Sequence, residues 1–237
     1  GGYVSSALKE NGDLYLWGLN FSEIAGTSQN VHGSVRYSKL AKMNFGDGIY
    51  IEDYDLGVGI PYAESGTDKN YHQIHIIVKT NENKILAWGD NMDILNMGPN
   101  ASSVYKLGTD QNEKTFANRV DITSKISDAI SDSGTVAQIS QICLGGSFSS
   151  ILVNGDIYVW GDNSKGQLGR NGISKSIDPL KVTSGDPERP IKNVKKISCG
   201  AQEITVLTVD GKIWSWGNNN NFPLENYSFD GDTTNEK

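Results

Sequence analysis

Hydrophobic residues along the chain occur in short alternating runs separated by turn-forming residues, and no long apolar stretch is present. Four of these runs end in the same Trp-Gly pair and occupy residues 12–18, 83–89, 155–161 and 211–217. Alternation over four to eight residues predicts β-strands. Because one unit recurs along the chain, it predicts a single supersecondary module repeated four times. We therefore expect an all-β protein built from four related units.

Each unit also predicts a β-hairpin. In the third unit, residues 150–153 form one β-rich run, Asn154-Gly155 follows, and residues 157–160 resume the pattern. Asn-Gly is a strong signal for a two-residue hairpin because both central residues of a type I′ turn need a positive φ. The second unit has Asn83 at the place of the turn glycine, and asparagine also tolerates the left-handed region.

The Trp-Gly strand carries apolar side chains on both faces. Ile157 and Val159 point to one face, and Tyr158 and Trp160 point to the other. A sheet packed between two neighbouring sheets has this pattern, whereas a half-solvated sheet would alternate with polar residues. We interpret the Trp-Gly pairs as structural repeat positions, with each glycine allowing a sharp turn or a close backbone approach. These positions are Trp17, Gly18, Trp88, Gly89, Trp160, Gly161, Trp216 and Gly217.

A third β-rich element precedes each later hairpin, for example residues 139–143 and 194–199. We place the units of a single domain at about 1–48, 49–135, 136–193 and 194–237, with long inserts at about 31–48 and 100–134. Within the second insert, Ile122, Ile126, Ala129 and Ile130 follow a helical spacing, which predicts a short helix or an extended loop.

Residues 160–169, Trp-Gly-Asp-Asn-Ser-Lys-Gly-Gln-Leu-Gly, closely resemble the signature of the regulator-of-chromosome-condensation repeats. The fourth unit keeps the Cys-Gly pair at 199–200 and Trp-Gly at 216–217. In the first two units, Ile24 and Leu95 lie at or beside the place of the signature leucine, Leu168. The resemblance implies a β-propeller of the seven-bladed type with one four-stranded blade per repeat. Since four units are present and the first residues align within a repeat, we expect four blades or parts of blades in an incomplete ring.

Composition and charge limit the class of partner. The net charge is -7, which is opposite to the basic balance of a nucleic-acid-binding protein. No apolar run approaches the roughly 20 residues of a membrane helix, so we expect no membrane insertion. The richness in Asn, Ile, Lys, Ser and Tyr favours a bacterial or protist source. Bacterial proteins with similar repeats are often exported, which slightly favours an extracellular or cell-surface location over a cytoplasmic one.

Cysteine, histidine and acidic residues give few candidates for chemistry. Cys143 and Cys199 form no CxxC motif, so we expect buried free thiols. The less favoured alternative is a disulfide between neighbouring units, which needs Cα atoms within about 7 Å. His75 is expected to be a buried hydrogen-bonding residue, and His72 would point to the opposite face. The cluster at residues 52–55 is interpreted as the acidic solvent face of a strand rather than a cation site.

No nucleophile, base or phosphate-binding loop occurs at a recognisable spacing, so we expect no catalysis, no cofactor and no metal. The sequence instead favours a protein–protein interaction scaffold that binds a protein partner through loops and inserts on one propeller face. One alternative is a hydrolase or a carbohydrate-binding, surface-associated module. The other, implied by the resemblance, is a guanine-nucleotide exchange factor for a small GTPase. The aromatic side chains considered for a sugar platform are Tyr37, Tyr62, Tyr105 and Tyr227.

Overall fold

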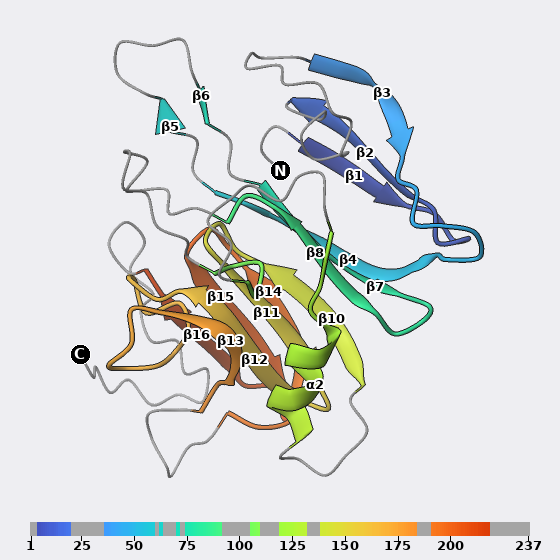
Figure 1. The fold of residues 1–237 in the computed structure, drawn as a ribbon. Coiled ribbons are helices and arrows are strands. Elements are labelled where there is room, and N and C mark those ends of the chain that lie inside the picture. The colour runs from blue at the N-terminus through green and yellow to red at the C-terminus, as the bar shows by residue number, and fades with distance from the viewer. Residues whose placement is uncertain are drawn as a thin grey trace.

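The computed structural model describes residues 4–19, 36–59, 62–63, 70–71, 74–91, 105–109, 119–131, 138–183 and 191–218. Four antiparallel sheets follow one another along the chain, and we call them blades 1 to 4 (Figure 1). Blade 1 has the order β1 (Val4–Leu8), β2 (Leu14–Leu19), β3 (Arg36–Lys42). Blade 2 has the order β4 (Ile51–Val58), β7 (Ile74–Thr80), β8 (Ile85–Gly89), β9 (Val120–Asp121).

Blade 3 has the order β10 (Ile139–Leu144), β11 (Phe148–Val153), β12 (Asp156–Asp162), β13 (Lys175–Lys181). Blade 4 consists of β14 (Val194–Cys199), β15 (Glu203–Thr208) and β16 (Ile213–Gly217). A small ribbon pairs β5 (Tyr62–Ala63) with β6 (Asn70–Tyr71), and one helix, α2 (Thr123–Ser131), lies beside blade 3. Each blade therefore repeats the same strand meander, as the sequence predicted.

Neighbouring blades share apolar cores, which explains why both faces of each sheet are apolar. Leu14 and Leu16 of blade 1 pack with Ile76 and Trp88 of blade 2 in one buried cluster. Separate clusters join blade 2 to blade 3 and blade 3 to blade 4. Trp88 and Trp160 are fully buried, whereas Trp17 and Trp216 are half-buried.

The glycine of each Trp-Gly pair has a positive φ of 112–127°, as seen in Gly161 and Gly18. A Cβ on Gly161 would collide with the backbone of Phe148 and Ser147 on the preceding strand. The next N–H, that of Asp162, donates to the Ser147 carbonyl over 2.9 Å. The expected close backbone approach is thus present, and it requires glycine. At the opposite end of the sheets, Asn83 and Asn154 adopt the positive φ that the hairpin turns demand.

The helix predicted from the apolar stripe is confirmed. Ile126 and Ile130 of α2, together with Ile122 just before it, are buried in the cluster between blades 2 and 3. Residues 36–42 and 120–121, which lie in the two expected inserts, form β3 and β9, the outer strands of blades 1 and 2. In the part of the chain that the structure describes, no helix has the length and hydropathy needed to cross a membrane.

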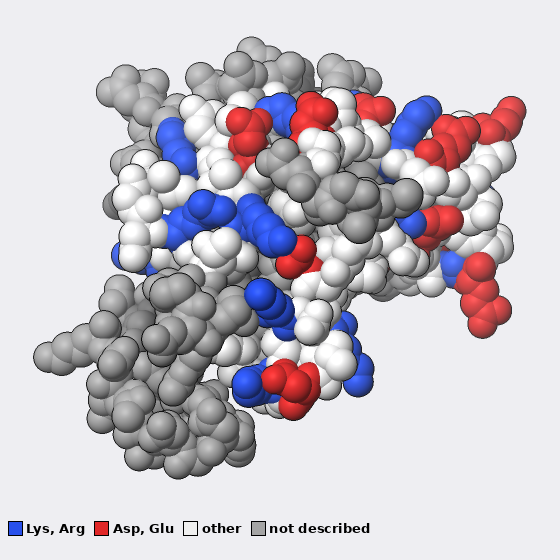
Figure 2. All heavy atoms as spheres, turned by 90° about the horizontal axis from the view of Figure 1, so that it is seen from below, with Lys and Arg blue, Asp and Glu red and all other residues white. Residues whose placement is uncertain are grey.

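Charged side chains of both signs share the surface. Figure 2 shows Lys and Arg side chains lying among Asp and Glu side chains on the face seen from below. Several form exposed pairs, such as Lys181 with Asp156 at 2.6 Å and Lys42 with Asp13 at 2.7 Å. Such pairs contribute little stability singly.

Candidate functional site

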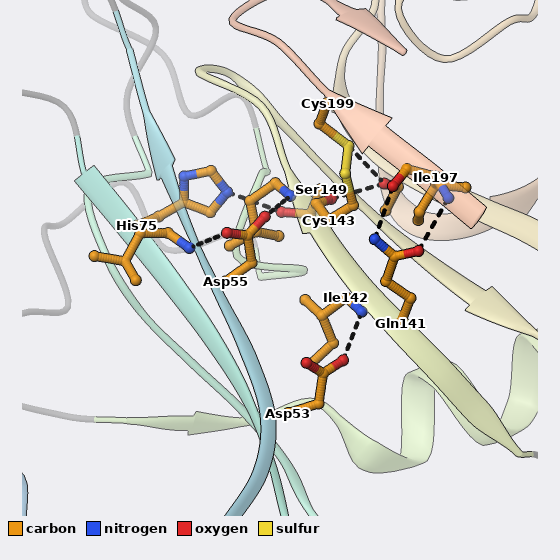
Figure 3. The surroundings of a disulfide bond; sticks show 12 residues. Asp53, Asp55, His75, Gln141, Ile142, Cys143, Ser149, Ile197 and Cys199 are labelled. Carbon is orange, nitrogen blue, oxygen red and sulfur yellow. Dashed lines mark hydrogen bonds between the residues drawn. A yellow bond between two sulfur atoms is a disulfide. The ribbon is translucent and has the colours of Figure 1, made fainter. Parts of the chain in front are cut away.

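Two aspartates of the inner strand β4 join blade 2 to blade 3 (Figure 3). Asp53 Oδ1 accepts the N–H of Tyr54 on its own strand, and Asp53 Oδ2 accepts the N–H of Ile142 on β10, both over 2.9 Å. Each carboxylate oxygen therefore satisfies one backbone donor at the free edge of an inner strand. Strand edges need such partners because an unpaired buried N–H is costly.

Asp55 repeats this arrangement two residues further on. Its oxygens accept the N–H groups of Leu56 and Leu144, each over 2.8 Å. Burial raises the pKa of both aspartates, and the backbone hydrogen bonds counteract this rise. The interpretation of residues 52–55 as an acidic solvent face was therefore wrong for Asp53 and Asp55. Only Glu52 is exposed, and it pairs with Lys79 at 2.6 Å.

Gln141 takes the place of Asp53 at the junction of blades 3 and 4 (Figure 3). Its Oε1 accepts the Ile197 N–H over 3.0 Å, and its Nε2 donates to the Ile197 carbonyl over 2.7 Å. An amide fits here because one donor and one acceptor converge, whereas two N–H groups converge on each aspartate.

Cys143 and Cys199 form a disulfide between the same two blades, with their Cα atoms 5.8 Å apart. The expectation of free thiols was wrong. Cys143 lies two residues before Gly145, but Cys199 lies directly before Gly200, so the two cysteines differ by one residue in register. Successive strand residues point to opposite faces, and this offset lets Cys143 face blade 4 while Cys199 faces blade 3. The offset was visible in the sequence and was the signal for the pairing.

His75 is fully buried between blades 2 and 3, as expected, and its Nε2 lies 3.0 Å from Ser149 Oγ. The Ser149 hydroxyl donates to the Lys106 carbonyl over 2.6 Å, so His75 Nε2 must carry the proton of the shared bond. Burial holds the pKa of His75 well below its ordinary value, and the charge of Lys106 lowers it further. With Ser149 also buried and its proton committed, this pair connects blades and offers no nucleophile to solvent.

In blades 2 to 4, the glycines at 57, 145 and 200 make room for the side chain at the start of the second strand. A Cβ on Gly57 would collide with the His75 ring, and one on Gly145 would collide with the Phe148 ring. On Gly200 a Cβ would collide with Glu203. His75, Phe148 and Glu203 therefore occupy one equivalent position, each opposite the glycine of its Trp-Gly pair.

The repeat tryptophans of blades 3 and 4 anchor these blades in the loop of the preceding blade. Trp160 Nε1 donates to the Lys106 carbonyl over 3.1 Å, and Trp216 Nε1 donates to the Gln167 carbonyl over 3.0 Å. Asn91 and Asn163 brace these loops. The Asn91 side chain accepts the N–H of Leu107, and the Asn163 side chain accepts the N–H of Leu168. Leu107 thus occupies the place of Leu168 in blade 2, and Leu95, which the sequence suggested, lies outside the described residues.

We call the loops at residues 105–109 and 162–175 the Trp-Gly rim. The second loop is held internally, since the Asp162 carboxylate accepts the Ser164 N–H over 3.0 Å and Gln167 Nε2 over 2.9 Å. It nevertheless leaves Ile173 37% exposed. The rim is therefore a rigid surface that presents an apolar side chain to solvent.

Of the four aromatic candidates for a sugar platform, Tyr105 has a described side chain. The Lys175 ammonium lies over the Tyr105 ring, 4.7 Å from its centroid. Tyr227 and the side chains of Tyr37 and Tyr62 lie outside the described part. Within that part, no group of three His, Cys, Asp or Glu side chains is placed to hold a metal ion.

Consecutive antiparallel blades, packed face to face, define a β-propeller, and the tryptophans of blades 3 and 4 anchor these blades in the loop before each. The described residues form an incomplete ring of this propeller. The family model of the regulator of chromosome condensation (RCC1) repeat matches residues 154–207, and a second model of that repeat matches residues 194–222. Residues 154–222 of the chain therefore consist of RCC1-type repeats.

Similar proteins support this assignment. The chain is 26% identical over 220 residues to the mitochondrial RCC1 domain-containing protein RUG3 of Arabidopsis thaliana, covering 92% of this chain and 40% of that protein. It is 31% identical over 81 residues to the ultraviolet-B receptor UVR8 of the same plant, covering 34% of this chain and 18% of the receptor. Among solved structures, yeast RCC1 (Prp20) bound to Kap60 superposes with a TM-score of 0.57 at 20% identity, covering 92% of this chain and 42% of that chain. This chain thus spans less than half of each of these proteins.

Proposed function

We propose that this chain is a protein–protein interaction scaffold whose protein partner binds the Trp-Gly rim. The observation that carries the proposal is the loop at 162–175, which is fixed by its own hydrogen bonds and still exposes Ile173. A pre-ordered loop loses little conformational entropy when a partner binds. An exposed aliphatic side chain on such a loop provides an apolar contact near the centre of an interface.

Two further observations support a protein partner. The Lys175 side chain is stacked on Tyr105, which ties the two loops of the rim into one surface. The solved yeast RCC1 (Prp20) structure, which shares the fold, is a complex with another protein, Kap60. Carbohydrate binding has weaker support, because Lys175 covers the one candidate aromatic ring that is described.

The disulfide bears on location. Disulfides persist in oxidising environments and are rare in the reducing cytosol. We therefore propose that the protein matures in an oxidising compartment, in line with the extracellular or cell-surface location that the sequence slightly favours.

The rim proposal is tested by quantitative affinity capture with three baits: the wild type, Ile173→Asp and Val209→Asp. Val209 is 70% exposed in the β15–β16 turn, at the opposite ends of the strands, so it is a matched control for the same kind of charge. We expect a stoichiometric protein partner with the wild type and with Val209→Asp, and its loss with Ile173→Asp. Equal capture by all three baits would exclude Ile173 and its loop as the binding surface.

A further inference from the structure

Three Asn-Gly pairs occur in the sequence, at residues 11–12, 154–155 and 171–172, and the structure holds them differently. An Asn-Gly pair can lose ammonia when the backbone nitrogen of the glycine attacks the side-chain amide carbon of the asparagine. Glycine favours this ring closure because it has no Cβ to obstruct the approach. Since all three asparagines precede glycine, differences in their reactivity depend on the surrounding structure.

Hydrogen bonds restrain both residues of the first pair. Asn11 Oδ1 accepts the Asp13 N–H over 3.2 Å, and Asn11 Nδ2 donates to Asp13 Oδ2 over 3.2 Å. The Gly12 nitrogen, which would have to attack, donates its N–H to the Lys9 carbonyl over 2.8 Å. The first pair must therefore break these bonds before it can react.

The second pair is held by the segments on both sides of it. Asn154 Oδ1 accepts the Gln138 N–H, and the Asn154 N–H donates to the Gln138 carbonyl, both over 3.3 Å. The Gly155 carbonyl accepts the Val194 N–H over 2.9 Å. This pair is thus tied to the strand connections before and after blade 3.

The third pair has no such restraint. Asn171 and Gly172 are both exposed, and among the described residues neither the Asn171 side chain nor the Gly172 N–H has a hydrogen-bond partner. Gly172 has a φ of +80°, and a Cβ built on it would meet no atom within 4 Å. The attacking nitrogen and the amide carbon are therefore both open to solvent.

The neighbours of this pair are fixed, which keeps the pair at the surface of the Trp-Gly rim. Asn163 Nδ2 donates to the carbonyls of Arg170 and Ile173, over 2.7 and 2.8 Å. The Asn163 N–H donates to the Ser174 carbonyl over 2.8 Å. The loop is thus anchored on both sides of the two unrestrained residues.

We propose that Asn171 is a site of spontaneous modification, at which the folded protein converts this asparagine to aspartate and isoaspartate. The Gly172 nitrogen forms a bond to Asn171 Cγ, the Cγ–Nδ2 bond breaks, and the side-chain nitrogen leaves as ammonia with the proton of the Gly172 N–H. Water then adds to either carbonyl of the cyclic imide and opens the ring. The resulting carboxylic acid is ionised near neutral pH, so the loop gains one negative charge.

The conversion changes the surface at which a partner is proposed to bind. The new carboxylate would lie two residues from Ile173, the exposed apolar side chain of the rim. A charge beside an apolar contact loses hydration when a partner covers it, which opposes binding. We therefore expect the conversion to weaken capture through the rim. This consequence rests on the function proposed for the rim, whereas the modification itself does not.

Timed incubation of the full chain at mildly alkaline pH, followed by digestion at acidic pH and peptide mass spectrometry, tests the modification. All three Asn-Gly pairs are measured in one sample, and electron-transfer fragmentation distinguishes isoaspartate from aspartate. We expect Asn171 to convert about tenfold faster than Asn154 or Asn11, because each hydrogen bond that must first break slows the reaction by a factor of about two to ten. In the same protein unfolded in guanidinium chloride, the matched control, the three rates should converge.

Equal rates at the three positions of the folded protein, or faster conversion of Asn154 or Asn11, would overturn the proposal. The effect on binding is tested by affinity capture with Asn171→Asp and with Asn154→Asp, which makes the same charge change in the turn between β11 and β12. We expect reduced capture with Asn171→Asp alone, and equal capture by both would overturn the effect on binding. If the unmodified wild type captures no partner, the rim function fails, and the conversion rates still decide the modification.

Discussion

Asp55 in blade 2 and Cys143 in blade 3 occupy the same position on successive inner strands, and each reaches the same position of the next blade. The Asp55 carboxylate accepts the backbone N–H of Leu144 over 2.8 Å, and Cys143 is bonded to Cys199, which stands where Leu144 stands. The two junctions are thus a hydrogen-bonded and a covalent version of the same connection between blades.

The disulfide is expected to stabilise the attachment of blade 4. It closes a loop of 56 residues, and a cross-link of this span contributes about 2–4 kcal/mol, chiefly by restricting the unfolded chain. Cys143→Ser with Cys199→Ser should therefore lower the free energy of unfolding by about that amount, measured by urea denaturation. The wild type under a reducing agent should match the double variant, and unchanged stability in both would contradict the role assigned to the bond.

A carboxylate should partly replace the disulfide. Cys143→Asp with Cys199→Leu copies the Asp55–Leu144 arrangement into the next junction, and Cys143→Ala with Cys199→Leu is the matched control without the acceptor. A hydrogen bond to a charged group contributes about 1.5–3 kcal/mol, and burial of the carboxylate removes part of this. We expect the aspartate variant to be more stable than the alanine control by about 1 kcal/mol in denaturant titrations. Equal stability would show that the two positions are not equivalent.

The choice between carboxylate and amide should matter at each junction. Asp53→Asn would place an NH₂ group against a backbone N–H, because two donors converge on Asp53. Gln141→Glu would place a carboxylate oxygen against the Ile197 carbonyl. Each change should cost about 1–2 kcal/mol of unfolding free energy near neutral pH. Glu52→Gln, on the exposed face of the same strand, is the control and should have little effect.

The sequence predicted the repeat, the hairpins and the helix, because these follow from local periodicity and turn chemistry. The contacts between blades were harder to predict. Asp53 and Asp55 look like a solvent-facing acidic pair until β10, almost 90 residues away, is placed beside them.

The cysteine pairing shows the same limit. The one-residue offset between Cys143 and Cys199 was visible, but its meaning depends on which face of each inner strand meets the neighbouring blade. In blade 2, the signature leucine at 107 was missed because more residues separate it from Trp88 in the sequence than separate Leu168 from Trp160.

His75 should make stability depend on pH below about 6.5. Its pKa in the folded protein is far below the ordinary value of about 6.5, so the unfolded chain binds a proton that the folded chain does not. Folding stability should therefore fall by about 1 kcal/mol between pH 7 and pH 5.5. His75→Phe, which copies Phe148 of blade 3, should remove this fall.

Asp53 and Asp55 affect folding stability in the opposite direction, because they add stability as the pH falls. Their pKa values are raised in the folded protein, so the folded state takes up protons first, and their contribution is largest below the ordinary carboxyl pKa. The difference between the wild type and His75→Phe, measured by denaturation at each pH, isolates the histidine. Parallel curves for the two proteins would contradict the buried neutral imidazole.

The equivalence of the blade junctions is tested most directly by moving the disulfide one blade back. Asp55→Cys combined with Leu144→Cys places two thiols where Cys143 and Cys199 stand in the next junction. Peptide mass spectrometry of the non-reduced protein should show residues 55 and 144 linked to each other, with the native link between 143 and 199 retained. Two unlinked thiols at 55 and 144, in a protein that keeps its native disulfide, would contradict the account.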